Sequence, residues 1–588
     1  MVKKWILGEF VKKNIVKYLI GIAALIATSL LQTSIPQLQG NIIDKLRERT
    51  ADQKQITFLV LLMVGIALTV FLLKFTWRYF LMGRARDLEC FLRAKLFAHF
   101  QSLDTKFYNN RKTGELMAYA INDLGAVRRA FAFGLVFLID GVVINLASLV
   151  VMVKIINPIL TVIALCPVIL SVFLLFKLRS KIRDKFTEVQ EAFADISEKT
   201  QENISGIRVV KAYVQEKYEI EKLQKASDRR TKVQLDYVKL SGLLGPSVQI
   251  CFGVSFTLVL IIGSNFVSKG VITLGNFVSF NMYLAMLTRP ITHIGKIVEV
   301  WQNALASIKR LDDIFEKKSE ITDEDSKVQN IKFKGNIEIR NLSFKYPGSK
   351  KYALKNIDIK LESGKTLALI GRTGSGKTTL VNLLLKLYKT ERNKIFIDGI
   401  DINDIDTATL RENIGCVPQD NFLFSTTIKQ NVAFFNKEFN DDQVINATKM
   451  SGVYDDIAEF PDGFNTVIGE RGITLSGGQK QRVSIARAFI KDPSILILDD
   501  CLSAVDTRTE EKILNNIKNI LKDRTGIIIA HRISTIKHAD EIIVLDDGEI
   551  IERGTHEELL KHRGSYYKLY NAQLAESSLQ QEEEDAAV

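Results

Sequence analysis

Residues 366–388 read TLALIGRTGSGKTTLVNLLLKLY, and this stretch decides how the second half of the chain folds. The run TLALI suits a buried strand, the run TTLVNLLLKLY suits a helix, and a glycine-rich loop joins them. The loop matches G-x-x-x-x-G-K-[ST], in which backbone N–H groups and a helix N-terminus bind phosphate. We expect Lys377 to reach the outer phosphates and the Thr378 hydroxyl to ligate Mg²⁺. The predicted nucleotide-binding residues of this loop are Gly371, Arg372, Thr373, Gly374, Ser375, Gly376, Lys377, Thr378 and Thr379.

Strands and helices alternate through the rest of this half. The apolar runs that read as strands are IEIRNLSFKY, TLALIG, KIFIDG, SILILDD, GIIIAH and EIIVLDDGEII. This alternation predicts an α/β domain with a mainly parallel sheet over residues 333–575. A polar stretch over 316–332 reads as a linker, and residues 576–588 read as an acidic, disordered tail.

Two further motifs in this domain carry candidate ligands. The stretch ILILDDCLSAVD, residues 495–506, delivers Asp499 at the end of an apolar strand, where it can hold Mg²⁺ or simply cap the strand. The stretch LSGGQ, Leu475–Gln479, opens a helix. Its serine suits an N-cap, and its hydroxyl and free amides also suit an anion. The phosphate-binding candidates there are Ser476, Gly477, Gly478 and Gln479.

The first half of the chain, residues 1–315, contains six long apolar stretches. They run over 15–40, 56–80, 131–153, 158–176, 243–267 and 274–296. About 20 apolar residues cross the roughly 30 Å of hydrocarbon in a bilayer. Any one stretch would also suit a buried helix of a soluble protein, but six in series predict a membrane domain. Asp140 interrupts the third stretch, so it is either a functional group or a neutral carboxyl buried in helix packing. Lys74 and Arg78 either snorkel to the interface or line a cavity.

Basic residues set the predicted orientation of these spans. The connection 83–130 holds nine Lys and Arg residues and the connection 177–240 holds fifteen, whereas the alternate connections hold six. By the positive-inside rule the two basic connections, both termini and the α/β domain are cytosolic. The formal net charge of +12 therefore needs no nucleic acid to explain it. The five cysteines show neither CxxC nor regular spacing, which favours a reduced setting without a zinc site.

The order of these motifs resembles the nucleotide-binding domain of ABC transporters, and the whole chain resembles a half-transporter of the ABC exporter type. The resemblance implies a bound ATP and Mg²⁺ and assigns three more residues. Tyr346 matches the aromatic that stacks on adenine, Gln419 the glutamine that approaches Mg²⁺, and His531 the histidine near the γ-phosphate. A packed strand tyrosine, an ordinary loop amide and a structural histidine are the alternatives. Further matches are the D-loop at Ser503–Asp506, the X-loop at Thr466–Gly472, and coupling helices at Phe107–Tyr119 and Ile204–Tyr213.

Asp500 departs from the family pattern, because the residue after the Mg²⁺ aspartate is normally a glutamate that positions or deprotonates water. One methylene fewer withdraws the carboxylate by about 1.5 Å. A misplacement of roughly 1 Å can lower a rate on the order of a hundredfold. The resemblance therefore implies a slow site at Asp500, paired in a heterodimer with an active site that the signature Ser476–Gln479 completes. A homodimer that tolerates aspartate is the alternative.

The expected function is ATP-driven export of a small molecule, a drug-like amphiphile or a lipid, across the cytoplasmic membrane. The expected partners are a second half-transporter chain, the lipid bilayer and a small-molecule substrate, with no nucleic acid. Two alternatives remain open: a homodimeric lipid or peptide exporter that uses Asp500 as a slow base, and an ABC-type channel or channel regulator.

Overall fold

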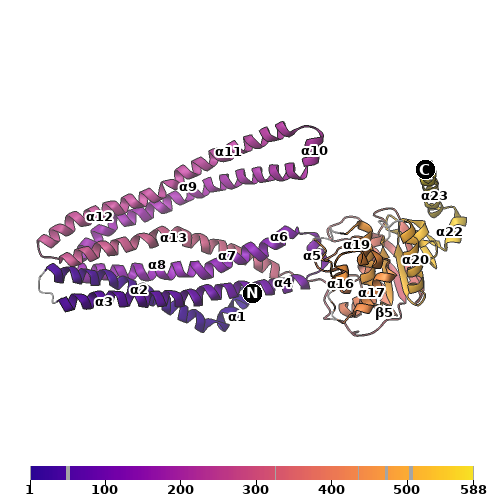
Figure 1. Ribbon diagram of the computed structural model, residues 1–588, viewed down its shortest axis with the longest axis horizontal. Coiled ribbons are helices and arrows are strands. Elements are labelled where there is room, and N and C mark those ends of the chain that lie inside the picture. Colours follow the sequence, from indigo (N-terminus) through magenta and orange to yellow (C-terminus); the bar gives the residue numbers. More distant parts are fainter. Residues whose placement is uncertain are drawn as a thin grey trace. The chain divides into compact units, whose positions relative to one another are not determined.

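The computed structural model describes residues 2–47, 53–324, 326–434, 436, 438–469, 475–501 and 507–586. The chain forms two compact units, which are described separately (Figure 1). The membrane unit comprises Met1–Gln101 and Thr113–Lys317, and the nucleotide unit comprises Ser102–Lys112 and Lys318–Val588. The short segment Ser102–Lys112 thus packs with the nucleotide unit, although the sequence places it inside the predicted membrane domain.

Long helices build the membrane unit. Each of the six predicted apolar stretches lies on a helix, in the order α2, α3, α8, α9, α12 and α13. Within the described residues, four helical runs are long and apolar enough to cross a membrane: Ile15–Arg47, Gln53–Ser102, Thr113–Ile156 and Glu216–Ser268. Pro158–Leu174, at the start of α9, is a shorter apolar helix. The helices are α1 (Val2–Lys13), α2 (Ile15–Arg47), α3 (Gln53–Trp77), α4 (Gly83–Ser102), α6 (Thr113–Ala118), α7 (Leu124–Arg129), α8 (Leu135–Val151), α9 (Pro158–Ser205), α10 (Ile207–Ala212), α11 (Glu216–Gly242), α12 (Leu244–Ser268) and α13 (Leu274–Phe315).

Small residues and hydroxyl groups join α2 to α13. A Cβ on Gly275 would lie 2.0 Å from the Gly40 carbonyl oxygen, so only glycine permits this approach. The Tyr283 hydroxyl donates to the Thr33 carbonyl at 2.7 Å, and the Ser279 hydroxyl donates to the Pro36 carbonyl at 2.7 Å. Backbone groups in a bilayer must find partners inside the protein, and these side chains supply them at the proline of α2.

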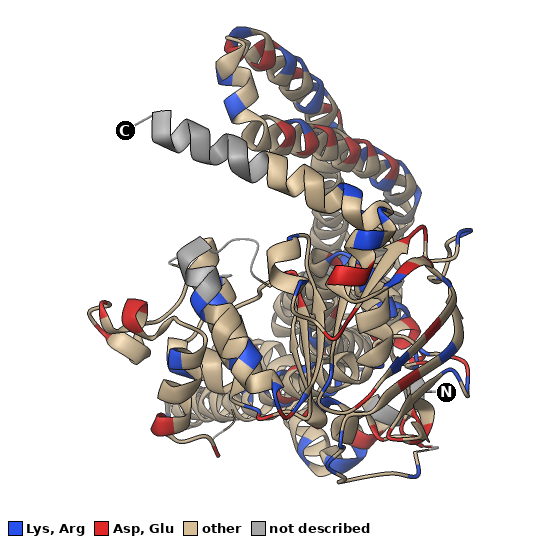
Figure 2. Ribbon diagram, turned by 90° about the vertical axis from the view of Figure 1, so that its right-hand side faces the viewer, with Lys and Arg blue, Asp and Glu red and all other residues tan. Residues whose placement is uncertain are grey.

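The extensions of the helices beyond the apolar stretches are strongly charged. Lys, Arg, Asp and Glu residues follow one another closely along α9, α10 and α11 (Figure 2). Arg310 on α13 pairs with Asp123, whose carboxylate also accepts a hydrogen bond from Ser307 at 2.8 Å. Side chains of this kind need water or an ionic partner, so these segments lie outside the hydrocarbon region.

Two sheets form the core of the nucleotide unit. The larger has the order β10-β9-β3-β8-β7-β6 and is parallel except for the β9–β10 hairpin. The smaller sheet, β2-β1-β4-β5, is antiparallel and contains the run IEIRNLSF, which the sequence did not separate from the parallel strands. The strands are β1 (Ile337–Phe344), β2 (Leu354–Leu361), β3 (Thr366–Gly371), β4 (Ile395–Ile397), β5 (Ile400–Asp401), β6 (Ile414–Val417), β7 (Ile495–Asp499), β8 (Thr525–Ile529), β9 (Glu541–Asp546) and β10 (Glu549–Gly554).

Helices cover the sheets of the nucleotide unit and complete its core. All residues of β7 are buried, because β6 and β8 flank it and side chains cover both of its faces. The helices are α5 (Thr105–Asn109), α14 (Lys377–Leu384), α15 (Thr407–Asn413), α16 (Ile428–Ala433), α17 (Asp441–Met450), α18 (Tyr454–Ala458), α19 (Gly477–Phe489), α20 (Thr507–Leu521), α21 (Ile533–Ile536), α22 (His556–His562) and α23 (Ser565–Ala586).

The end of the chain differs from the predicted disordered tail. The helix α23 continues through Ala586, well into the segment 576–588. Gln, Glu, Leu and Ala dominate that segment, and their intrinsic helix propensity is high.

Candidate functional site

The glycine-rich loop follows β3 and ends where α14 begins. Gly376 has φ = 104°, and a Cβ at this position would lie 2.5 Å from the Ala353 carbonyl oxygen. The left-handed backbone and the close contact both require glycine there. The loop can therefore turn its N–H groups inward at the start of a helix, which is the geometry of a phosphate site.

The ammonium group of Lys377 is held inside this loop. Its Nζ donates to the carbonyl oxygens of Gly371 at 2.8 Å and Arg372 at 2.9 Å. Only 6% of the residue is exposed, and burial lowers the pKa of Lys377 while the nearby Asp499 and Asp500 raise it. The loop and the two carboxylates thus fix a positive charge beside the glycine-rich loop, which suits the outer phosphates of a nucleotide.

The carboxyl ends of the parallel strands meet around this loop. Asp499 ends β7, Gln419 follows β6 and His531 follows β8. Ligand sites of open α/β sheets lie at this edge because loops there project side chains into a common crevice. Together with the loop they line an open pocket of about 540 Å³. Of the predicted residues, the pocket gathers Tyr346, Thr373, Gly374, Gly376, Lys377, Thr378, Thr379, Gln419, Asp499, Asp500 and His531.

Asp499 and Thr378 form a hydroxyl–carboxylate pair. Asp499 is 3% exposed; burial raises its pKa, and the hydrogen bond from Thr378 lowers it. Among the described residues, no group of three His, Cys, Asp or Glu side chains is arranged to hold a metal. The pair suits Mg²⁺, which takes one or two protein oxygens and completes its shell with water and substrate phosphates.

The backbone of Asp500 is clamped on both sides. Its φ is 47°, its N–H donates to the Ile529 carbonyl at 2.8 Å, and its carbonyl accepts from Gln481 Nε2 at 3.2 Å. Two hydrogen bonds thus hold the main chain of Asp500, and a forward shift of this residue would have to break them. Gln481, which is 2% exposed, has no motif of its own that would reveal this role from sequence.

On the aromatic side of the pocket, Tyr346 contacts Tyr388, which in turn contacts the helix α5, a segment far away in sequence. The Tyr346 hydroxyl donates to Thr379 Oγ1 at 3.1 Å, and its ring packs edge-on against Tyr388 with centroids 5.1 Å apart. On α5, Asn109 donates to the Tyr388 hydroxyl at 2.5 Å, and Thr105 donates to the Leu387 carbonyl at 2.7 Å. Burial raises the pKa of Tyr388. Asn109 and Tyr388 therefore connect the predicted first coupling helix to the predicted adenine-stacking ring.

The signature Ser476–Gln479 lies elsewhere in the nucleotide unit and contributes nothing to the described lining of this pocket. Ser476 caps α19: its Oγ accepts from the Gln479 N–H at 3.2 Å, and Gln479 Oε1 accepts from the Ser476 N–H at 3.0 Å. Ser476 therefore acts as the N-cap of α19. The D-loop Ser503–Asp506 and residues 470–472 of the X-loop fall outside the described residues.

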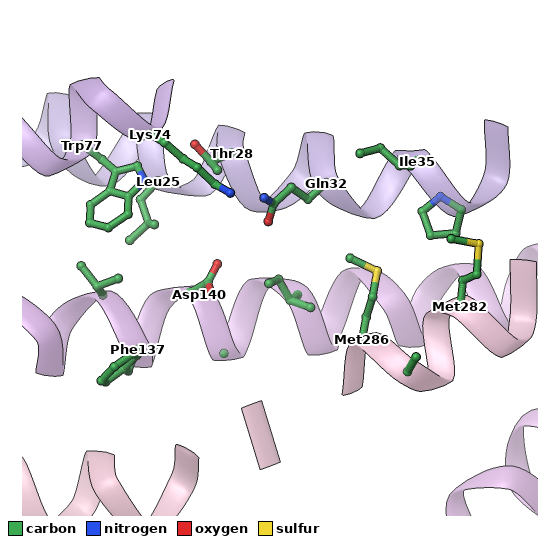
Figure 3. Close-up of a pocket in the computed structure, with 15 residues that line it drawn as sticks. Leu25, Thr28, Gln32, Ile35, Lys74, Trp77, Phe137, Asp140, Met282 and Met286 are labelled. Atoms are coloured by element: carbon green, nitrogen blue, oxygen red, sulfur yellow. The ribbon is translucent and has the colours of Figure 1, made fainter. Parts of the chain in front are cut away.

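The membrane unit contains a separate cavity of about 700 Å³. Asp140 on α8 accepts a hydrogen bond from the buried Ser29 hydroxyl of α2 at 2.6 Å, which supplies the partner that sequence could not name. Figure 3 shows Asp140 facing the helices that carry Thr28, Gln32 and Lys74. Lys74 thus lines the cavity, whereas Arg78 is not part of its described lining. Apolar and sulfur-containing residues make up most of the remaining wall, including Leu25, Ile35, Trp77, Phe137, Met282 and Met286.

Comparisons with known proteins agree with the division of the chain into a membrane unit and a nucleotide unit. Residues 18–291 match the ABC transporter transmembrane region, and residues 354–503 match the ABC transporter domain. The chain is 36% identical over 567 residues to the Bacillus subtilis probable multidrug resistance ABC transporter ATP-binding/permease protein YheI, covering 96% of this chain and 97% of the relative. It is 34% identical to the Syntrophus aciditrophicus ATP-dependent lipid A-core flippase over 491 residues, or 84% and 81% of the two chains.

A solved structure of similar architecture is a bacterial Atm1-family ABC exporter with ATP bound. It superposes with a TM-score of 0.77 at 26% identity, covering 97% of this chain and 98% of the other. The match therefore spans the membrane helices and the nucleotide domain together. With the phosphate loop, the strand-end carboxylates and the long apolar helices in place, the chain belongs to the ABC transporter family, as an exporter-type half-transporter that couples ATP hydrolysis to transport across a membrane.

Proposed function

We propose that this chain exports a small amphiphile, a drug-like compound or a lipid, across the cytoplasmic membrane by alternating access. The observation that carries this proposal is the cavity of the membrane unit, which combines a mainly apolar wall with the carboxylate of Asp140. An amphiphile has both kinds of surface. The names of two relatives, a multidrug resistance transporter and a lipid A-core flippase, agree with a substrate of this class.

The chemistry of the cavity favours a cationic headgroup. A carboxylate among membrane helices is costly to leave without a partner, and a ligand cation offsets that cost. Ser29 donates one hydrogen bond to Asp140, which orients the carboxylate and leaves it capacity to accept more. Met282, Met286 and Trp77 suit varied apolar bodies, because thioethers adapt in shape and an indole face attracts a cation.

The nucleotide pocket binds ATP, and we assign Mg²⁺ to the pair Thr378 and Asp499. The metal, when bound, neutralises charge on the phosphates. Lys377 holds the outer phosphates, Tyr346 packs on the adenine ring, and Gln419 and His531 approach the metal and the γ-phosphate. Asp500 orients the attacking water, and the fixed backbone on either side of it prevents a compensating shift toward that water.

This geometry supports a slow site at Asp500 and a heterodimer. Exporters of this family act as dimers, and the family resemblance implies that the signature of one chain completes the nucleotide site of the other. Ser476–Gln479 is intact here and opens α19 with a capped N-terminus, so it is able to serve a partner's site. We therefore assign the fast hydrolysis to a site whose glutamate comes from a different chain.

Exposed apolar side chains on cytosolic elements support contact with such a partner. On α10, Ile207 is 48% and Val209 is 61% exposed. In the nucleotide unit, Phe422 and Phe434 are exposed, and the Arg487 guanidinium lies 5.1 Å from the centroid of the Phe434 ring. Such patches on soluble surfaces mark interaction sites. In the proposed orientation, the basic connection 177–240 that contains α10, the nucleotide unit and both termini are cytosolic.

Reconstitution tests this proposal. The chain is purified alone and with a co-expressed candidate partner, placed in lipid vesicles, and assayed for ATP-dependent movement of a fluorescent cationic amphiphile and of a fluorescent lipid. We expect transport only from the two-chain complex, and none with Lys377 and the partner's equivalent lysine both replaced. Steady transport and ATP hydrolysis by this chain alone would favour the homodimer. ATP hydrolysis by the complex that neither amphiphile changes, with no movement of either, would contradict the substrate class.

A further inference from the structure

The segment that carries His531 is held by a side chain from the C-terminal helix α23. Gln573 Nε2 donates to the His531 carbonyl oxygen at 2.6 Å, and Gln573 Oε1 accepts from the Ile533 N–H at 2.9 Å. One amide group therefore bonds to the main chain on both sides of Arg532. An amide side chain carries both a donor and an acceptor, whereas an ionised glutamate of the same length lacks the donor.

The helix that carries Gln573 is itself fixed to the nucleotide unit. Glu552 on β10 accepts from the first N–H groups of α23, at Ser565 and, at 3.0 Å, at Tyr566. Tyr566 is fully buried, and its hydroxyl lies 2.7 Å from His556 Nδ1. It belongs to the same apolar cluster as Ile533 and Ile536 of α21. These contacts anchor the first turns of α23, and so fix the position from which Gln573 reaches the main chain.

We propose that Gln573 is the positioning residue for His531. The two hydrogen bonds fix the peptide group after His531 and the one before Ile533, which restricts the backbone dihedrals around Arg532. His531 is an exposed residue on the rim of the nucleotide pocket, so burial alone does not hold it in place. The clamp substitutes for burial and directs the imidazole toward the γ-phosphate.

This role makes Gln573 a determinant of how the site distinguishes ATP from ADP. The inference rests on the proposed assignment of His531 to the γ-phosphate. A correctly held imidazole gains a hydrogen bond to ATP that ADP cannot make. Releasing the clamp lowers the share of molecules in which His531 is correctly placed, and so weakens ATP binding alone. The P-loop contacts to the remaining phosphates are unaffected.

The test uses the full chain, with its partner where the two co-purify. Photolabelling of this chain by a photoreactive ATP analogue is competed with a hydrolysis-resistant ATP analogue or with ADP. The variants are Gln573→Ala, His531→Ala and the double variant. Asn571→Ala is the matched control, because Asn571 is an exposed amide residue on the same helix with no described hydrogen bond. Thermal unfolding of each variant shows that the nucleotide unit stays folded.

We expect Gln573→Ala to lower the affinity for the ATP analogue by about three- to tenfold, which is the effect of losing one or two hydrogen bonds. The affinity for ADP should stay the same. In the His531→Ala background the same change should have no further effect, because its target is gone. Equal losses for both nucleotides, or additive losses in the double variant, would overturn the inference. If His531→Ala itself leaves the preference for ATP intact, the assignment of His531 in the proposed function fails instead. An effect of Asn571→Ala equal to that of Gln573→Ala would also count against the clamp.

Discussion

The nucleotide pocket and the membrane cavity each place a hydroxyl against a carboxylate, but the two pairs have different surroundings. In the pocket, Thr378 bonds to Asp499 beside the buried ammonium of Lys377, and the charges partly balance within one loop and one strand end. In the cavity, Ser29 bonds to Asp140 among apolar walls, and Lys74 comes from a different helix. In the proposed function, the first pair serves one fixed ligand charge, and the second accepts amphiphiles of many shapes.

The contrast extends to the backbone around each site. Peptide groups of the pocket are tied down individually, as at Asp500 and at His531, so small changes in side-chain length matter there. The cavity is lined by side chains from several helices, so its shape depends on how those helices pack. Chemistry on phosphates needs placement to within about 0.5 Å, whereas binding an amphiphile tolerates more variation.

Replacing Lys377 should give the largest loss of ligand affinity. A smaller loss would contradict the contrast between the nucleotide pocket and the membrane cavity. Lys377→Ala removes a charged group that bonds directly to phosphate, which costs about 2–3 kcal/mol or a roughly 30- to 150-fold loss of ATP affinity. Photolabelling of this chain by a photoreactive ATP analogue measures it. Amphiphile binding to the cavity, measured by fluorescence without nucleotide, serves as the control and should not change. Undiminished labelling would refute the phosphate assignment.

The next largest effect separates the two hydrolytic roles of this chain. In the two-chain complex, Ser476→Ala should lower ATP turnover about tenfold or more, because the serine serves the active site across the interface. Asp500→Ala should change turnover by about twofold or less, since this site contributes little of the fast chemistry. Steady-state phosphate release from the matched complexes provides the comparison. If Asp500→Ala alone stops turnover, the slow-site proposal is wrong.

An intermediate effect is expected in the membrane cavity. Asp140→Asn keeps the shape and the hydrogen bond from Ser29 but removes the charge, so transport of cationic amphiphiles should fall about five- to tenfold. Neutral amphiphiles of the same size should be transported as before. Ser29→Ala leaves the charge and should have a smaller effect on the cations. Equal losses for charged and neutral substrates would instead indicate that Asp140 is needed for helix packing.

The smallest effect is expected at Tyr388, on the aromatic side of the nucleotide pocket. Tyr388→Phe keeps the ring against Tyr346 but removes the hydroxyl that accepts from Asn109, a loss of about 1 kcal/mol or roughly fivefold. We expect basal ATP binding to stay the same and the stimulation of ATPase by substrate to fall. Asn109→Ala should reproduce that fall, and the double variant should add nothing to it. An unchanged stimulation ratio in both variants would remove Tyr388 from the coupling path.

Much of the nucleotide site could be read from the chain, because its ligands lie in short contiguous motifs. The loop Gly371–Thr378 needs glycines at fixed positions and a helix immediately after it, and both are local properties. The apolar runs before Asp499 and His531 were also visible as strands, and parallel strands place their carboxyl ends at one edge of the sheet. Gln419 and the role of His531 came from the family resemblance, because the short strand β6 was not predicted. The antiparallel sheet was not separated from the parallel one, because strand direction depends on partners distant in sequence.

The residues that hold the nucleotide site in place could not be predicted from contiguous motifs. Gln481, Gln573, Tyr388 and Asn109 carry no motif, and each acts through a hydrogen bond or ring contact with a residue 19 to 279 positions away. The cavity shows the same limit. The apolar stretches and the isolated Asp140 were visible, but its partner Ser29 lies 111 positions away on another helix.

The sequence by itself determined the class of protein. The length of its apolar segments specifies spanning helices, and the spacing of glycine, lysine and acidic residues specifies a phosphate site. These are properties of single segments, governed by hydrophobic length, backbone dihedrals and helix termini. Only the tertiary structure decided which groups share a cavity, which groups hold the backbone of Asp500, and that α23 holds the segment of His531. Hydrogen bonds and burial between distant segments exist only once the chain is packed, so no local pattern could have specified them.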